Sequence, residues 1–456
     1  MLRTLPLLVL SYGLCLAASP CAAAPQVDPR PNIVIIVADD LGWADVGFHR
    51  GRIPTPQLDR LASDGVQLSQ HYVSPMCSPT RAALLSGRFA SRFGVVSATN
   101  SRVFRPGTTT LASALKAAGY DTAIIGKWHL GSEPKSGPLH YGFDRSYGSL
   151  AGGVGPYTHQ YQDGPYTKTW QRDHVFVQEE GHVTDLLTKE AIQWIEQRSN
   201  SRPFFLYLAF TVPHHPLQEP PEWVNRFPGI QPLSHRHYVA AVAHMDNAIG
   251  QVLAKLEASG RKGNTLVLFF SDNGAIPDDQ NNRTEYPPGS YPEGPVGSSN
   301  APLRGCKGQL YEGGIRVPAV AYWPARLKPG TTTAPVHVVD WMPTLTTLAG
   351  YEATSNLKWD GRDVWPLLTG RTQPVERVFY WLGPDHSRAV RRGDWKLIVH
   401  SPLLNRADEL FNLAADPGER TNGASGQPER VAALKRILEE AARSDNDALA
   451  EPELRK

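Results

Sequence analysis

Short apolar runs rich in β-branched and aromatic residues recur along the 456-residue chain. Runs of this length and composition predict strands buried on both faces of a sheet. Amphipathic patterns between the runs, two of them stopped by glycine, predict helices. The alternation of strands with helices predicts an α/β sandwich around a large, mostly parallel sheet. The predicted strands occupy residues 32–38, 122–125, 204–210, 265–270 and 317–323, and the predicted helices occupy 110–118, 184–198 and 238–258.

The pattern changes after about residue 350. Short strand-like runs predict a small antiparallel sheet, and a final amphipathic segment over 428–443 predicts a helix that follows it. We therefore expect a main domain over 30–350 and a C-terminal subdomain over 351–456. The runs of the predicted small sheet occupy residues 378–381, 388–390, 395–399 and 409–413.

The first residues have the composition of an export signal. Arg3 supplies a positive charge, residues 5–16 are largely apolar, and three alanines at 22–24 offer a cleavage site. The apolar stretch is too short for a membrane span, and no later stretch qualifies as a transmembrane segment. We predict a signal peptide over 1–24 and an exported protein, either periplasmic or secreted.

The net charge and the cysteines limit which binding partners and which cysteine states are expected. The formal net charge of +2 favours neither nucleic acid nor an anionic membrane as a partner. Of the four cysteines, Cys15 and Cys21 lie in the predicted leader, and Pro20 disfavours lipidation of Cys21. The mature chain keeps Cys77 and Cys306, which either form one disulfide, remain buried thiols or include a cysteine with its own chemistry.

Two predicted strands end in pairs of oxygen-bearing side chains. Asp39 and Asp40 follow the first strand, and Asp272 and Asn273 follow a late one. Ligands of open α/β sheets bind beyond the carboxyl ends of the strands. Two such pairs together predict a site for one hard cation such as calcium or magnesium, although either pair alone is also typical of a turn.

Two further strands end in cationic or imidazole side chains. Lys127 and His129, two residues apart in an extended segment, point to the same side and are able to reach one anion. The alternative is a surface lysine beside a packed histidine. After the fourth strand, flanking prolines stiffen a turn that holds His214 and His215, and one of these histidines is expected at the same rim.

A cysteine is predicted at the start of a helix. Pro79 suits a first helical turn and Gly87 a helix stop, so Cys77 lies where free backbone amides favour an anion. Arg81 lies one turn further on the same face. A helix cap with a buried thiol explains the cysteine but not the arginine. Lys307 lies in a glycine-rich bend of the kind that approaches ligands closely, or in a plain surface turn.

Taken together, these segments resemble the type I, formylglycine-dependent sulfatase family. The sequence Cys77-Ser78-Pro79-Thr80-Arg81 and the seven residues after it, AALLSGR, are similar to the family's modification motif. The segments at 39–40, 126–131 and 272–274 and Lys307 match in order. The resemblance covers nearly the whole mature chain and is closest to arylsulfatases and N-acetylgalactosamine sulfatases. It implies the alkaline-phosphatase-like fold, with residues 30–350 as the catalytic sulfatase domain.

The resemblance also implies two cofactors. Calcium would be bound by Asp39, Asp40, Asp272 and Asn273 together with the modified Cys77. A separate formylglycine-generating enzyme would oxidise Cys77 to formylglycine (3-oxoalanine), whose aldehyde hydrates to a gem-diol. One hydroxyl would then attack sulfur as the ester oxygen leaves, and the other hydroxyl would expel sulfate and regenerate the aldehyde.

The family's catalytic roles carry over to matching positions. Arg81 and calcium would stabilise the nucleophile, and Lys127 would bridge the nucleophile and a sulfate oxygen. His129 would take the proton from the second hydroxyl. His214 and Lys307 would bind sulfate oxygens, and one of them would protonate the leaving alcohol. The choice of His214 over His215 follows the family's Pro-His-x-Pro pattern.

The same sequence features are compatible with other functions. A hydrolase of phosphonate monoesters or phosphodiesters would share the fold, although the set Lys127, His129, His214 and Lys307 favours sulfate. A non-catalytic binder of sulfated glycans and an unmodified cysteine nucleophile are further alternatives. Two predicted wall loops, at 147–166 and 277–302, are rich in aromatic and polar residues. We expect sulfate monoesters of sugars or aryl sulfates as substrates, and the loop composition favours a sulfated sugar.

Overall fold

The computed structural model describes residues 2, 30–162, 164–199, 201–277 and 291–450. Most of the predicted signal peptide at 1–24, with Cys15 and Cys21, lies outside the described residues, as does half of the predicted loop at 277–302. Export of the protein stays a prediction, and so does the domain boundary near residue 350. Among the described helices, none has the length and apolarity that crossing a membrane requires.

A ten-stranded sheet forms the centre of the molecule. Its five adjacent strands β9, β1, β8, β4 and β5 are parallel, and antiparallel pairs join them to strands at both edges. The strands, in their order across the sheet, are β12 (Gly330–Thr332), β2 (Val66–Leu68), β11 (Ala319–Tyr322), β9 (Thr265–Ser271), β1 (Asn32–Ala38), β8 (Phe204–Ala209), β4 (Asp121–Gly126), β5 (Arg145–Ser149), β6 (Trp170–Arg172) and β7 (Val175–Phe176).

Side chains of the central strands feed two separate cores. Along β1, Ile33, Ile35 and Val37 belong to the core on one face of the sheet, whereas Val34 and Ile36 belong to the core on the other. This alternation follows from the two-residue period of a strand. Both sets of side chains are apolar because helices cover both faces, and the predicted α/β sandwich is confirmed.

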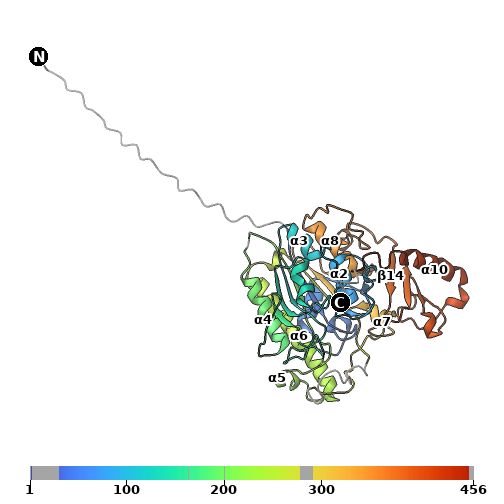
Figure 1. Cartoon of the computed structure of the whole chain (residues 1–456), viewed down its shortest axis with the longest axis horizontal. Coiled ribbons are helices and arrows are strands. Elements are labelled where there is room, and N and C mark those ends of the chain that lie inside the picture. Colours follow the sequence, from blue (N-terminus) through green and yellow to red (C-terminus); the bar gives the residue numbers. More distant parts are fainter. Residues whose placement is uncertain (1, 3–29, 163, 200, 278–290, 451–456) are drawn as a thin grey trace.

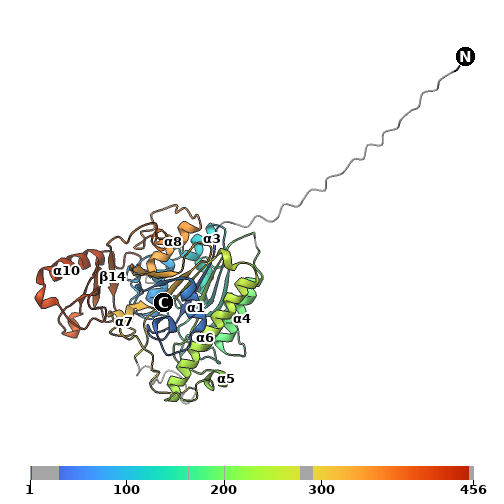
Figure 2. The ribbon, with the colours of Figure 1, turned by 180° about the vertical axis from the view of Figure 1, so that it is seen from behind.

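Three main helices pack on each face, as Figures 1 and 2 show for those labelled. The cysteine-bearing helix contributes Ala82 to Leu85 to the first core. The helices of that face are α2 (Cys77–Ser86), α3 (Leu111–Ala117) and α8 (Trp341–Leu348). The helices of the other face are α1 (Pro56–Asp64), α4 (Val183–Glu196) and α6 (Leu233–Ala258). Shorter helices are α5 (Pro221–Val224), α7 (Glu312–Ile315) and α9 (Trp365–Leu368).

The predicted C-terminal sheet and helix are present and lie at one end of the molecule (Figure 1). Four strands pair antiparallel in chain order, and the following helix buries Leu434 and Leu438. Tyr72 and Ile315 of the main body pack against the opposite face of this sheet. The elements are β14 (Val378–Leu382), β15 (Arg388–Arg392), β16 (Trp395–Val399), β17 (Glu409–Asn412) and α10 (Pro428–Ala442).

Two element predictions were wrong in detail. The strand predicted over 317–323 is divided at Pro318, whose missing amide proton interrupts the ladder. Its first part is β10 (Arg316–Val317), in a three-stranded sheet with β3 (His71–Tyr72) and β13 (Val336–His337), and its second part is β11. The helix predicted from residue 238 begins at Leu233, immediately after Pro232.

A buried ionic cluster joins the C-terminal sheet to the main body. Lys396 on β16 is fully buried, and its Nζ lies 3.0 Å from Glu312 Oε1 and 2.8 Å from Glu419 Oε1. Tyr72 donates a hydrogen bond of 2.6 Å to Glu312 Oε2. Arg316 Nη1 lies further away, 3.6 Å from Glu312 Oε2. Because Lys396 is the near cation of both buried carboxylates, the attachment of the sheet depends on Lys396.

We expect Lys396→Met to lower the free energy of unfolding by about 3–5 kcal/mol, since it leaves Glu419 without its ion-pair partner and Glu312 with the more distant Arg316. Urea denaturation measures the change. Lys435→Met is the matched control, because Lys435 is 44% exposed in its pair with Asp408 and its loss costs at most about 1 kcal/mol. Equal effects of the two substitutions would show that the buried cluster does not hold the sheet.

Candidate active site

The carboxyl ends of four adjacent parallel strands form the site. Strands β1 and β9 pair so that Ala38 lies beside Ser271, and the residues that follow each strand are therefore neighbours. Strand β8 leads into the turn with His214, and β4 leads into Lys127 and His129. The parallel register is the reason why side chains far apart in the sequence meet at one edge of the sheet.

Three carboxylates lie together at this edge. Oxygen atoms of Asp39, Asp40 and Asp272 are all within 4.8 Å of one another, and all three side chains are fully buried. Asn273 donates from Nδ2 to Asp40 Oδ1 over 2.7 Å. Burial, together with the charge of Asp39, raises the pKa of Asp272. The cluster therefore needs positive charge close by.

Each carboxylate has one basic partner. Arg81 donates to Asp272 Oδ2 from Nε over 3.1 Å and from Nη2 over 2.7 Å. Lys127 Nζ lies 2.6 Å from Asp39 Oδ2, and Lys307 Nζ lies 2.7 Å from Asp40 Oδ2. Burial alone lowers the pKa of both lysines, but the neighbouring carboxylates and Cys77 outweigh it and the net pKa of each is raised. The lysines therefore stay charged at neutral pH.

One carboxylate oxygen and one carboxamide oxygen near the cluster lack a hydrogen-bond donor. Within the part of the chain that the structure describes, Asp39 Oδ1 and Asn273 Oδ1 are buried and have no hydrogen-bond partner. A buried oxygen without a donor costs free energy. A hard cation that prefers oxygen ligands would satisfy both atoms, so the residues present fit a calcium ion.

Cys77 is the first residue of α2, as the sequence predicts. Gly87 caps the helix in a left-handed conformation with φ of 68°. The Cys77 thiol is buried, and its Sγ lies 3.3 Å from His129 Nδ1. Burial raises the pKa of this thiol against the opposing charges of Lys127 and Lys307. Cys77 and Cys306 are both free, so the disulfide considered from the sequence does not form.

The two predicted histidines hold neutral rings. Burial lowers the pKa of His129 well below its ordinary value, and the charges of Lys127 and Arg81 lower it further. Burial likewise lowers the pKa of His214, with Lys307 as the next cause. His214 Nε2 lies 3.6 Å from Asp40 Oδ2. A neutral imidazole beside the Cys77 side chain is suited to accept a proton.

A cavity of about 280 Å³ opens above these groups. Four predicted residues line it: Cys77, His129, His214 and Lys307. Arg81 and Lys127 are instead fully buried on the carboxylates, and Arg81 Nη1 donates to the Lys127 carbonyl over 2.9 Å. The predicted wall loop at 147–166 supplies Gly152, Gly153, Tyr161 and Gln162, and His215 and Gly308 adjoin predicted residues. Sequence reasoning missed the remaining lining residues, which are Met76, Ala98 and Pro384.

One wall of the cavity needs glycine. A Cβ on Gly153 would lie 2.5 Å from His214 Nδ1, and a Cβ on Gly152 would lie 3.1 Å from His129 Cε1. The glycine pair was the available signal, since adjacent glycines in a loop often mark close approach. This wall belongs to the predicted loop at 147–166. From the predicted loop at 277–302, the described residues do not line the cavity.

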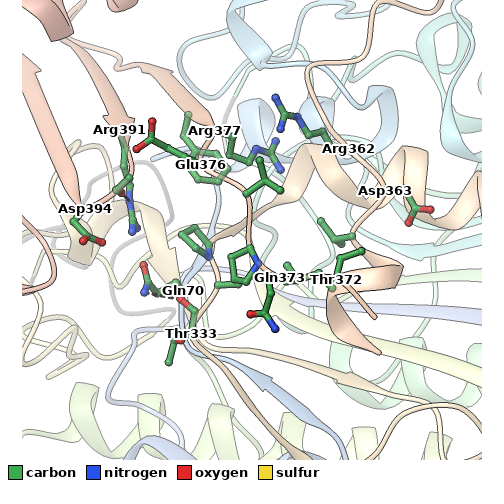
Figure 3. Close-up of a pocket in the computed structure, with 18 residues that line it drawn as sticks. Gln70, Thr333, Arg362, Asp363, Thr372, Gln373, Glu376, Arg377, Arg391 and Asp394 are labelled. Atoms are coloured by element: carbon green, nitrogen blue, oxygen red, sulfur yellow. Dashed lines mark hydrogen bonds between the residues drawn. The ribbon is translucent and has the colours of Figure 1, made fainter. Parts of the chain in front are cut away.

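A larger cavity, of about 330 Å³, lies elsewhere between the main body and the C-terminal sheet (Figure 3). Arg391 and Asp394 lie on one side of it and Arg362 and Asp363 on the other, and Gln70 is among the other lining residues. It is lined by neither a cysteine nor a histidine. Without a nucleophile or a metal-ligand cluster, this cavity is not the candidate active site.

We expect Arg81→Ala to lower the free energy of unfolding by about 3–5 kcal/mol in EDTA-containing buffer, because Asp272 would be buried without its counter-charge. Urea denaturation measures the loss. Arg60→Ala is the control, since Arg60 is 69% exposed in a pair with Asp64, and its removal costs less than about 1 kcal/mol. A change for Arg81→Ala as small as that of the control would contradict the charge-pairing account.

Comparison with known proteins agrees with this geometry. The chain matches the family described as Sulfatase over residues 31–351, and its C-terminal part matches N-sulphoglucosamine sulphohydrolase, C-terminal, over residues 306–444. Arylsulfatase G of Rattus norvegicus is 35% identical over 468 residues, covering 90% of this chain and 85% of the relative. N-acetylgalactosamine-6-sulfatase of Canis lupus familiaris is 33% identical over 440 residues, covering 90% and 80%.

The fold is also similar to that of a solved structure, Ps i-CgsB in complex with k-i-k-neocarrahexaose. The two chains are 30% identical and superpose with a TM-score of 0.82, over 93% of this chain and 96% of the other. The resemblance drawn from the sequence motifs is thus confirmed over most of the chain.

Proposed function

The chain belongs to the sulfatase family and is a sulfuric ester hydrolase, and we propose that it cleaves sulfate monoesters of sugars with a formylglycine made from Cys77. The observation that carries the proposal is the position of Cys77. Its side chain opens into the cavity from a helix start, in contact with the neutral His129 and within the field of three buried carboxylate–cation pairs.

Calcium is the proposed metal. Asp39, Asp40, Asp272 and Asn273 would hold it together with the modified residue 77, since they supply only oxygen ligands and two of those oxygens lack donors. When both groups are in place, the hydrated formylglycine would supply an oxygen nucleophile and the ion would stabilise its negative charge. Because the three carboxylates are already neutralised, the ion's charge would remain available to attract an anionic ester.

Side chains of this chain would accept the proton, neutralise the carboxylates and bind the sulfate group. His129 Nδ1, 3.3 Å from the position of Sγ, accepts a proton from the side chain of residue 77. Arg81 and Lys127 hold the carboxylates and supply positive charge beneath the nucleophile. His214 and Lys307 both contact Asp40 and both line the cavity, where they bind sulfate oxygens and one of them protonates the leaving alcohol.

A sugar sulfate is the proposed substrate class. The canine relative is named for a sulfated amino sugar, and the similar solved structure holds a neocarrahexaose. Tyr161 and Gln162 on the cavity wall offer an aromatic face and an amide, the groups that commonly contact sugar rings and hydroxyls. Maturation would require a formylglycine-generating enzyme as a partner. An unmodified cysteine nucleophile is disfavoured, because burial raises the pKa of the thiol.

Peptide mass spectrometry across Cys77 tests the modification directly. On protein made with a formylglycine-generating enzyme, we expect an aldehyde at this position. Cys77→Ala should retain the fold and reduce sulfatase turnover at least about 10³-fold, because it removes the nucleophile. Cys306→Ala, the matched control, should keep near wild-type activity. An intact thiol in an active preparation, or substantial turnover by Cys77→Ala, would refute the mechanism.

The leaving-group role of Lys307 predicts a dependence on the substrate. We expect Lys307→Met to reduce kcat about 10²–10⁴-fold for a sugar sulfate, whose alkoxide needs a proton, and much less for an activated phenyl sulfate. Lys135→Met, at a lysine that is 64% exposed, is the control. Equal losses on both substrates would argue against proton donation. Faster turnover of matched phosphonate esters than of sulfate esters would favour the alternative hydrolase.

A further inference from the structure

A second buried charged cluster lies outside the catalytic cavity. His182 caps the start of α4, Glu219 follows the His214 turn, and His244 lies on α6. Their exposed fractions are 3%, 4% and 2%, respectively. None of the catalytic steps proposed above uses these residues. A buried carboxylate between two imidazoles is costly unless it is paired, so its position requires an explanation.

Glu219 lies between the two imidazoles and contacts both of them. Glu219 Oε2 lies 2.8 Å from His244 Nδ1, and Glu219 Oε1 lies 3.3 Å from His182 Nε2. The other ring nitrogen of His244 lies 3.0 Å from Asp185 Oδ1. Burial lowers the pKa of His244, but its hydrogen bonds to Asp185 and Glu219 outweigh this effect and raise the pKa to about 9. His244 is therefore an imidazolium between two carboxylates.

The same three residues have the donor types of a metal site, but their hydrogen bonds argue for ion pairing. His182 Nδ1 accepts a hydrogen bond from the Thr184 amide over 3.3 Å. With Nδ1 acting as an acceptor, a ring proton lies on Nε2, which faces Glu219 and leaves no lone pair on that atom for a metal. Both nitrogens of His244 face carboxylates and carry protons. A metal would have to displace these protons, so its presence is an outcome that the experiment must test.

The cluster holds both walls of the catalytic cavity. The glycine-bearing wall loop, residues 152–161, is fixed to the His182 segment, since Val183 donates to the Pro156 carbonyl over 2.8 Å and His159 Nε2 lies 3.0 Å from the Gly181 carbonyl. The ring of Tyr157 contacts that of His182 with centroids 5.2 Å apart. The second wall, the turn at 211–216, continues directly into Glu219.

The two walls also pack closely against each other. A Cβ on Gly153 would meet both His214 Nδ1 and the His215 carbonyl within 3.0 Å, so a small displacement of either wall moves His214. We propose that Glu219 is a positioning residue, which holds the wall loop and the His214 turn together by pairing with His182 and His244. This inference rests on the proposed function of His214. A 1 Å displacement of such a group costs up to about 10²-fold in rate.

A double-mutant cycle tests the inference on the full chain with a sugar sulfate. Glu219→Gln keeps the shape of the side chain and removes its charge, and we expect kcat/KM to fall about 10–100-fold. In a His214→Ala background, the same change should cost less than about threefold, because the group it positions is gone. Glu196→Gln, at an exposed carboxylate on the same helix as His182, is the matched control and should cost less than threefold in both backgrounds.

Equal losses from Glu219→Gln in the two backgrounds would overturn the positioning role. Hydrogen exchange provides a readout independent of turnover, and amides of residues 152–161 should exchange at least about tenfold faster in Glu219→Gln. Unchanged exchange would also overturn the proposal, as would one equivalent of bound transition metal lost on this substitution. If His214→Ala alone leaves turnover intact, the proposed role of His214 fails, while the exchange result still decides whether Glu219 holds the walls.

Discussion

The pairing of three buried carboxylates with three buried cations is the interaction on which the site depends. Asp39, Asp40 and Asp272 repel one another at close range, and their burial is tolerable only because Lys127, Lys307 and Arg81 each neutralise one of them. Those cations come from three different segments of the chain. The electrostatic requirement of the cluster therefore also fixes the helix of Cys77 and the Lys307 bend against the sheet.

Buried charged side chains with two partners occur at two further places in the molecule. Lys396 pairs with two carboxylates where the C-terminal sheet meets the main body, and Glu219 pairs with two imidazoles behind the cavity walls. In each case one buried charge joins elements that are distant in the sequence. Buried pairs contribute little net stability compared with apolar packing, but losing one partner is costly. They are therefore suited to fixing the relative positions of elements that must form a site.

Much of the fold and of the site could be predicted from local pattern. The apolar runs predicted the central strands, because strands buried on both faces carry a strong compositional signal. Position at a strand end or a helix start singled out Asp39 and Cys77, and a glycine-rich bend singled out Lys307. The structure brings these three residues together. The strand at 317–323 was predicted less well, since a proline break and a change of sheet depend on neighbouring strands that the local pattern does not contain.

The sequence by itself determined the α/β class, the residue types available for chemistry and the family, because these depend on periodicity and on contiguous motifs. Only the tertiary structure decided how those residues pair. Arg81, one turn after Cys77 on α2, forms its ion pair with Asp272, and Lys127 lies beneath the cavity on Asp39 rather than in its wall. The roles of Gly153 and Glu219 also emerged only in three dimensions. The physical reason is that burial and Coulomb interactions depend on distances between segments far apart in the sequence.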